Sequence, residues 1–100
     1  MSAIAELSIF PLDKGESVSS YVAEAVRIIQ ASGLDYEIGA MGTCFEGDWD
    51  EVARAAKESM DAMKNNCARV YMVLKVDYRA GQDNRMKGKV DSLKKIAGSE

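Results

Sequence analysis

Alternation of apolar and polar side chains marks the first strand of the chain. Residues 3–10 alternate with the period of two expected for a strand. One face consists of Ala3, Ala5, Leu7 and Ile9, and the other consists of Ile4, Glu6, Ser8 and Phe10. Pro11 ends this strand, and the more apolar face is expected to pack against helices.

Two later segments carry apolar residues at helical spacing. The first begins after Ser17, which we expect to be the N-cap, and ends before Gly33. Its apolar face comprises Val18, Tyr21, Val22, Ala25, Ile28 and Ile29. The second runs from Asp48, which has capping-box spacing to Glu51, to about Asn66. Its buried stripe comprises Val52, Ala55, Ala56, Met60 and Met63.

The remaining segments complete a mixed fold. Leu34–Met41 and Thr43–Glu46 are predicted to form a hairpin that reverses at Gly42. Arg69–Arg79 alternates clearly and is predicted to be the last strand. A final helix follows, with an apolar side made of Met86, Val90, Leu93 and Ala97.

This order of elements, β-α-β-β-α-β with a C-terminal helix, predicts an α+β protein with a ferredoxin-like antiparallel sheet. We expect residues 1–100 to form a single domain, with the first and third strands at the centre of the sheet and both long helices on one face.

The sheet face opposite the two long helices carries the candidate chemistry. Its expected members include Glu6, Ser8, Glu37, Cys44, Glu46, Tyr71, Lys75 and Asp77. A carboxylate in the middle of a sheet is unusual unless the face is solvated, paired or used for a ligand. The alternative is a wet or dimer-forming face on which Lys75 pairs with Glu6.

The composition and net charge of the chain limit the kinds of catalysis and ligand that are expected. The chain of 100 residues contains no histidine, which excludes histidine-based catalysis and histidine metal sites. Its net charge is −3, with −5 over residues 1–79 and +2 over residues 80–100. An acidic body tolerates a cationic small molecule and is a poor match for nucleic acid.

The cysteines and the N-terminal segment favour a cytoplasmic protein. Cys44 and Cys67 form no disulfide framework and are expected to be reduced. The first ten residues lack the basic start of a signal peptide, and no apolar run approaches membrane-spanning length. The acidic residues Asp48, Asp50 and Glu51 are better explained by the helix dipole than by a metal.

An ordered set of short motifs resembles the small thiamine-binding protein family, long catalogued as a family of unknown function. The matching positions are Glu6, Ser8, Ile9 and Pro11 in the first strand, Ser17, Val18 and Ser19 at the helix start, Ser32, Gly33 and Leu34 at its end, and Met41, Gly42, Thr43, Glu46 and Gly47 in the hairpin. Arg69, the run Asp77-Tyr78-Arg79, Met86, Lys89 and Val90 complete the set. One departure is Ala40, where the family has proline.

The resemblance implies a ferredoxin-like fold, dimers that pair into tetramers, and binding of thiamine or its hydroxymethylpyrimidine portion without catalysis or a cofactor. Thiamine needs carboxylates, hydroxyl groups and an aromatic or methionine wall. The candidate ligand-binding residues are Glu6, Ser8, Ser17, Tyr21, Tyr36, Met41, Thr43, Phe45 and Glu46. Thr43 and Phe45 point away from Glu46 in a regular strand, so all nine line one site only at the edge of the hairpin or at a bulge.

Two other classes of function stay open. A homo-oligomeric regulatory or protein-interaction domain would use the polar sheet face without a small ligand. A dimeric α+β-barrel enzyme would need a positioned acid or base, a role that the two glutamates could fill. No metal, nucleic acid or membrane partner is expected.

Overall fold

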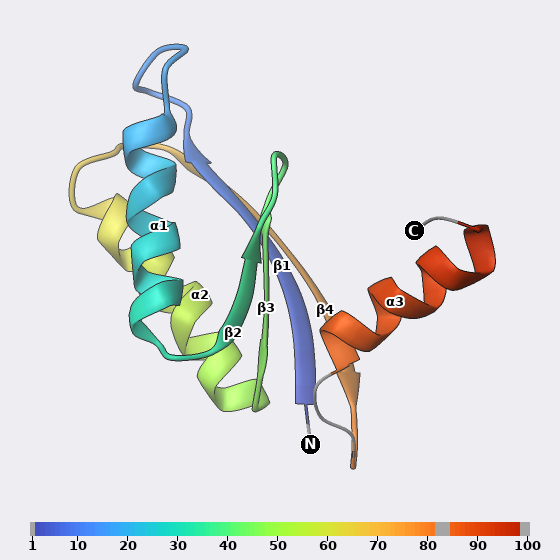
Figure 1. Cartoon of the computed structure of the whole chain (residues 1–100). Coiled ribbons are helices and arrows are strands. Elements are labelled where there is room, and N and C mark those ends of the chain that lie inside the picture. The colour runs from blue at the N-terminus through green and yellow to red at the C-terminus, as the bar shows by residue number, and fades with distance from the viewer. Residues whose placement is uncertain (1, 82–84, 99–100) are drawn as a thin grey trace.

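The first strand, β1 (Ser2–Pro11), runs through the interior of a four-stranded sheet in the computed structural model of the chain (Figure 1). The structure describes residues 2–81 and 85–98. The later elements are α1 (Ser19–Ala31), β2 (Asp35–Ile38), β3 (Thr43–Gly47), α2 (Trp49–Lys64), β4 (Val70–Arg79) and α3 (Arg85–Ala97). This order confirms the predicted β-α-β-β-α-β arrangement with an added C-terminal helix.

The strands lie in the order β2-β3-β1-β4, and each neighbouring pair is antiparallel. β1 pairs with β4 along its whole length, from Ser2 opposite Arg79 to Pro11 opposite Val70. Its pairing with β3 is shorter and ends where Leu7 lies opposite Thr43. The sheet is therefore the predicted ferredoxin-like one, with β1 and β3 as its central strands.

Helices α1 and α2 cover one face of the sheet, and α3 projects from the other (Figure 1). The covered face of β1 is its predicted apolar set, and the buried core comprises Ala3, Ala5, Leu7, Ile9, Ala25, Ile29, Phe45, Val52, Ala55 and Met63. The alternation in β1 thus determines which face of the sheet the two long helices cover.

The predicted helix ends are confirmed at Gly33, which follows α1 with a φ of 79°, and at Asp48, the N-cap of α2, but the predicted N-cap Ser17 is wrong. The N-cap of α1 is Val18, whose carbonyl accepts bonds from the amides of Tyr21 and Val22 at 3.0 Å each, so Ser17 stays exposed in the preceding loop. Packing of the apolar side of α1 against the sheet, rather than a capping hydroxyl, determines where this helix begins. Asp48 is the N-cap of α2 but makes no side-chain cap bond, so the capping box does not form.

The hairpin is shorter than predicted. β2 ends at Ile38 instead of Met41, because the amide of Gly39 donates to the carbonyl of Gly42 at 2.9 Å and closes a turn. A Cβ atom at Gly39 would lie 2.9 Å from that carbonyl oxygen, so a larger residue would push the turn open.

Within the described residues, no helix is both long and apolar enough to cross a membrane.

Candidate functional site

The nine predicted ligand-binding residues do not share one cavity. Ser8, Met41 and Thr43 line a cleft between α1 and the tip of the β2–β3 hairpin. Tyr36 and Glu46 line a separate cavity between β2 and α3. The other four, Glu6, Ser17, Tyr21 and Phe45, line neither of these cavities.

The first cavity, which we call the hairpin cleft, has a volume of about 280 Å³. Its walls come from β1 residues 7–10, the inward side of α1 and hairpin residues 38–43. Apolar side chains dominate its lining, and they include Val18, Val22, Ile29, Ile38 and Met41. A cleft of this size and character suits one flat ring held by a few polar groups.

An unpaired stretch of β1 borders the hairpin cleft. Pairing between β1 and β3 ends at Leu7, whereas β1 continues to Pro11 against β4 alone. In a strand, alternate residues direct their N–H and C=O groups to each edge. Leu12 bonds Arg69 in continuation of this register, so Ser8 and Phe10 direct their backbone groups to β4, and Ile9 presents its N–H and C=O along an edge that no other described strand covers.

Glu6 lies on the opposite sheet face, beside the hairpin tip. A Cβ atom built at Gly42 would lie 3.1 Å from the Glu6 Cγ atom. The lack of a side chain at Gly42 therefore makes room for the side chain of Glu6. The Lys75 Nζ atom lies 3.0 Å from Glu6 Oε1, and the Cys44 thiol donates to Glu6 Oε2 at 3.9 Å. The Glu6–Lys75 pair foreseen as an alternative is thus confirmed.

The environment of Glu6 also affects the thiol beside it. Burial, followed by the negative charge of Glu6, raises the pKa of Cys44, so the thiol is held neutral. A neutral thiol serves as a small apolar contact and weak donor. Cys44 and Glu6 line a second groove of about 570 Å³, which lies between the open sheet face and α3.

The Glu46 carboxylate bonds to the start of α3. It is buried, and its two carboxylate oxygens accept bonds from the backbone amides of Arg85, at 2.7 Å, and Met86, at 3.3 Å. A carboxylate at the first turn also complements the helix dipole. Glu46 therefore anchors α3 from beneath, and the two glutamates face different cavities although they share a sheet face.

Three other predicted residues serve the fold. Phe45 is fully buried in the core, where it lies opposite Ala5. Tyr21 packs against that core, and the Tyr36 hydroxyl accepts a bond from Gln30 Nε2 at 3.0 Å on the surface. With Ser17 in the loop before α1, these positions bring no polar group into the hairpin cleft.

Sequence reasoning named Ser17 and Tyr21 at the start of α1 as ligand-binding candidates, but not the two valines of this helix that line the hairpin cleft. Val18 and Val22 were identified as one apolar face of this helix, yet they line the hairpin cleft instead of closing against the sheet. The signal that points to the cleft is the short hairpin, because β3 begins only at Thr43 and leaves the start of α1 facing β1 alone.

In residues 2–81 and 85–98, no three cysteine or carboxylate side chains come together in a way that could hold a metal ion. Asp50 and Glu51 lie in the first turn of α2, where their charge favours the helix dipole.

The sheet order, the covered face and the cleft define a ferredoxin-like α+β protein. The family described as "Thiamine-binding protein" matches residues 5–94, and the chain belongs to this family. UPF0045 protein MJ1052 of Methanocaldococcus jannaschii is 41% identical over 90 residues, 90% of each chain. Its crystal structure has a TM-score of 0.86 and 40% identity, covering 92% of this chain and 95% of that chain.

Another relative shows a similar degree of likeness. UPF0045 protein Mb1933 of Mycobacterium bovis is 38% identical over 96 residues, which cover 95% of this chain and 94% of that protein. The names of these relatives assign no reaction, and the family description refers to binding.

Proposed function

We propose that the protein binds thiamine, or the hydroxymethylpyrimidine portion of thiamine, and acts in the cytoplasm as a non-catalytic carrier or sensor. The observation that carries this proposal is the hairpin cleft of about 280 Å³, which lies beside an uncovered strand edge. Membership of a family described as thiamine-binding supports the choice of ligand.

The aminopyrimidine ring fits the chemistry of the cleft. Its two flat faces would pack against the side chains of Val18 and Val22 from α1 and Ile38 from the hairpin. Its edge carries adjacent donors and acceptors, which match the backbone N–H and C=O of Ile9 and the hydroxyl of Thr43. This arrangement combines apolar walls with a few orienting polar groups.

The thiazolium ring of thiamine carries a permanent positive charge, and Glu6 is the carboxylate beside the hairpin tip. Glu6 is available for a cation because its pair with Lys75 is exposed: 39% of the Glu6 side chain and 73% of the Lys75 side chain are accessible. An exposed ion pair contributes little, so a bound cation can replace the ammonium group.

Calorimetric titration with thiamine tests this proposal. We expect saturable binding by the unmutated protein and a loss of about ten- to a hundredfold in affinity for Glu6→Gln, because a charge-assisted contact is removed. Glu37→Gln is the matched control, since Glu37 carries the same charge on the open sheet face but lies on the edge strand β2, whereas Glu6 is the carboxylate that approaches Gly42 at the hairpin tip. Thr43→Val should weaken thiamine and the neutral hydroxymethylpyrimidine alike.

The absence of any binding heat for the unmutated protein would defeat the proposal. Equal losses in Glu6→Gln and Glu37→Gln would also count against it, because they would reflect the overall charge of the protein rather than a site.

We further propose that the protein assembles as a homo-oligomer through its open sheet face. Phe10 and Tyr71 stack on this face, with ring centroids 5.7 Å apart, and Tyr71 and Val73 are half exposed. Ile96 of α3 is more exposed still. A second copy that covered these side chains would remove a sizeable apolar surface from water.

A further inference from the structure

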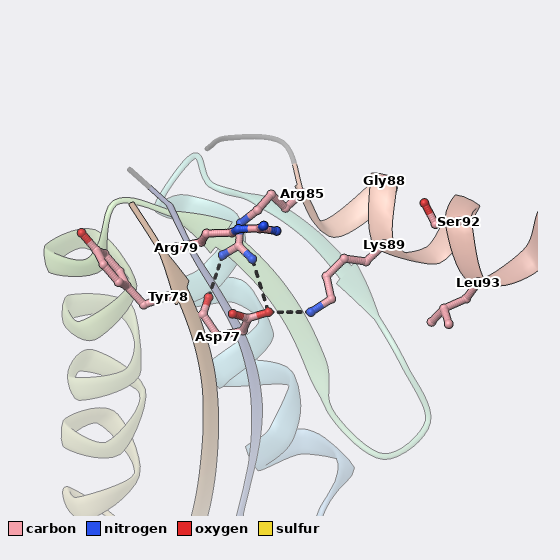
Figure 2. Close-up of a pocket in the computed structure, with 8 residues that line it drawn as sticks. All are labelled: Asp77, Tyr78, Arg79, Arg85, Gly88, Lys89, Ser92 and Leu93. Carbon is pink, nitrogen blue, oxygen red and sulfur yellow. Dashed lines mark hydrogen bonds and ion pairs between the residues drawn. The ribbon is translucent and has the colours of Figure 1, made fainter. Parts of the chain in front are cut away.

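A groove of about 730 Å³ lies between the end of β4 and the first turns of α3. Figure 2 shows Arg79, Arg85 and Lys89 gathered near Asp77, with Ser92 and Leu93 farther along α3. We call this the basic groove. It lies at the Ser2 end of β1, whereas the hairpin cleft lies toward the Pro11 end.

Helical spacing aligns the polar wall of the basic groove. Arg85, Lys89 and Ser92 recur at intervals of four and three residues, which places them along one side of α3. Gly88 lies between them, and a Cβ atom built there would meet no atom within 4 Å. The wall therefore presents two cations and a hydroxyl beside open space.

Arg85 is held in a fixed orientation. It is buried, and its Nε atom donates to the Ser2 hydroxyl at 3.1 Å, while its guanidinium NH2 group donates to the Asp77 carbonyl at 2.8 Å. Its NH1 group lies 3.3 Å from Asp77 Oδ2, the same oxygen that Lys89 Nζ contacts at 2.5 Å. Two cations thus share one carboxylate oxygen.

Positive charge remains in excess at this groove. The nearby carboxylate of Glu46 is turned to the backbone amides of α3 and does not line the groove. Arg79 lines the groove and forms no ion pair with any residue in the described ranges 2–81 and 85–98. Among the described residues that line the groove, three cationic side chains therefore accompany one carboxylate, in a protein whose net charge is −3.

We propose that the basic groove binds a terminal phosphate group, either free or in a phosphomonoester. The guanidinium of Arg79 offers the planar pair of donors that suits phosphate oxygens, Lys89 adds a mobile positive charge, and the Ser92 hydroxyl adds a donor. Leu93 continues the wall beyond Ser92, so the organic part of an ester gains an apolar contact.

Titration of the full chain with inorganic phosphate and with phenyl phosphate, at constant ionic strength maintained with sodium chloride, tests the proposal. Chemical shifts of backbone amides follow binding. Both ligands are expected to shift the amides of residues 77–79 and 85–93 saturably, and phenyl phosphate is expected to bind more tightly. Arg79→Gln should weaken both by about tenfold.

Arg54→Gln is the matched control, because it removes the same charge from an exposed position on α2. Its affinity for phosphate should equal that of the unmutated protein. The proposal is overturned if neither phosphate nor phenyl phosphate saturates, or if Arg54→Gln and Arg79→Gln weaken binding equally. If phosphate binds as tightly as phenyl phosphate, the site takes free phosphate and the assigned contact with Leu93 is wrong.

Discussion

Glu6 and Glu46 lie on neighbouring central strands and share a sheet face, yet their carboxylates meet different partners. Glu6 is opposite Cys44 and meets the exposed ammonium of Lys75, whereas Glu46 is opposite Ile4 and meets the buried first turn of α3. The two glutamates are therefore only two residues apart in the register of β1 and β3, yet one carboxylate is available to a cation and the other supports a helix.

Removing Lys75 should strengthen thiamine binding. Lys75 Nζ lies 3.0 Å from Glu6 Oε1 and competes with a bound cation for that oxygen. In Lys75→Gln, calorimetry should show thiamine affinity raised by about two- to fivefold, since an exposed pair is worth up to about 1 kcal/mol. The neutral hydroxymethylpyrimidine should bind as before. Weaker thiamine binding in this variant would mean that Lys75 itself contacts the ligand.

Asp77 should show a clear pH signature. The ammonium of Lys89 is the main cause that holds the pKa of Asp77 below its ordinary value of 3.8, although desolvation opposes it. A lowered folded-state pKa gives stability that is complete above the ordinary value and is lost as the pH falls through the lowered pKa. In Lys89→Gln the pKa of Asp77 should therefore rise, and acid should loosen α3 at a higher pH.

Carbon-13 NMR titration of the Asp77 carboxyl group measures this directly. An unchanged Asp77 pKa in Lys89→Gln would show that the contact between the two side chains does not persist in solution.

At the scale of elements, α3 depends on a few polar anchors. Glu46 accepts bonds from two of its first-turn amides, and Arg85 bonds Ser2, a residue 83 positions away. The outer part of this helix exposes Leu93 and Ile96. Docking of α3 therefore rests on its first turn.

Glu46→Gln should loosen α3 without affecting thiamine binding. The change replaces one acceptor oxygen by an amide group that cannot accept, and a bond to a charged group is worth about 1.5–3 kcal/mol. Hydrogen exchange should show faster exchange in residues 85–97, while Glu37→Gln leaves these rates unchanged. Lost thiamine affinity with normal exchange in α3 would instead assign Glu46 to the ligand.

The sequence predicted the elements better than it predicted their ends. Periodicity identified both long helices, but it favoured Ser17 as an N-cap where the structure has Val18. A capping hydroxyl is a local preference, and packing of the later α1 residues Ala25 and Ile29 into the core overrides it. The position of the hairpin was predicted correctly. Its length was not, because the backbone bond from Gly39 to Gly42 that shortens it does not alter the alternation of apolar and polar residues in the sequence.

At the scale of the whole molecule, alternation in β1 and β4 was sufficient to predict the sheet and its covered face. The position of α3 could not be predicted, because it depends on contacts between residues far apart in the sequence, such as Arg85 with Ser2 and Glu46 with the amide of Arg85. The edge of the hairpin was predicted as one place for the site, but the walls of the hairpin cleft could not be predicted, because they come from three segments that are separate in the sequence.

The open sheet face should control assembly. Val73 is 43% exposed on that face, and Val73→Lys should dissociate a homo-oligomer by placing a charge in its apolar contact. Light scattering after gel filtration reports the mass. Leu12→Lys is the control, because Leu12 is similarly exposed, at 45%, in the loop after β1. A monomeric unmutated protein would remove this part of the account.

Amide chemical-shift mapping with hydroxymethylpyrimidine and thiamine tests the central claim most directly. The account predicts saturable shifts for the amides of residues 39–43, at the hairpin tip, and 18–22, at the start of α1, with both compounds. Thiamine should add a shift at Glu6. Shifts confined to the groove between α3 and the open sheet face, or none at saturating ligand, would contradict the assignment of the hairpin cleft as the binding site.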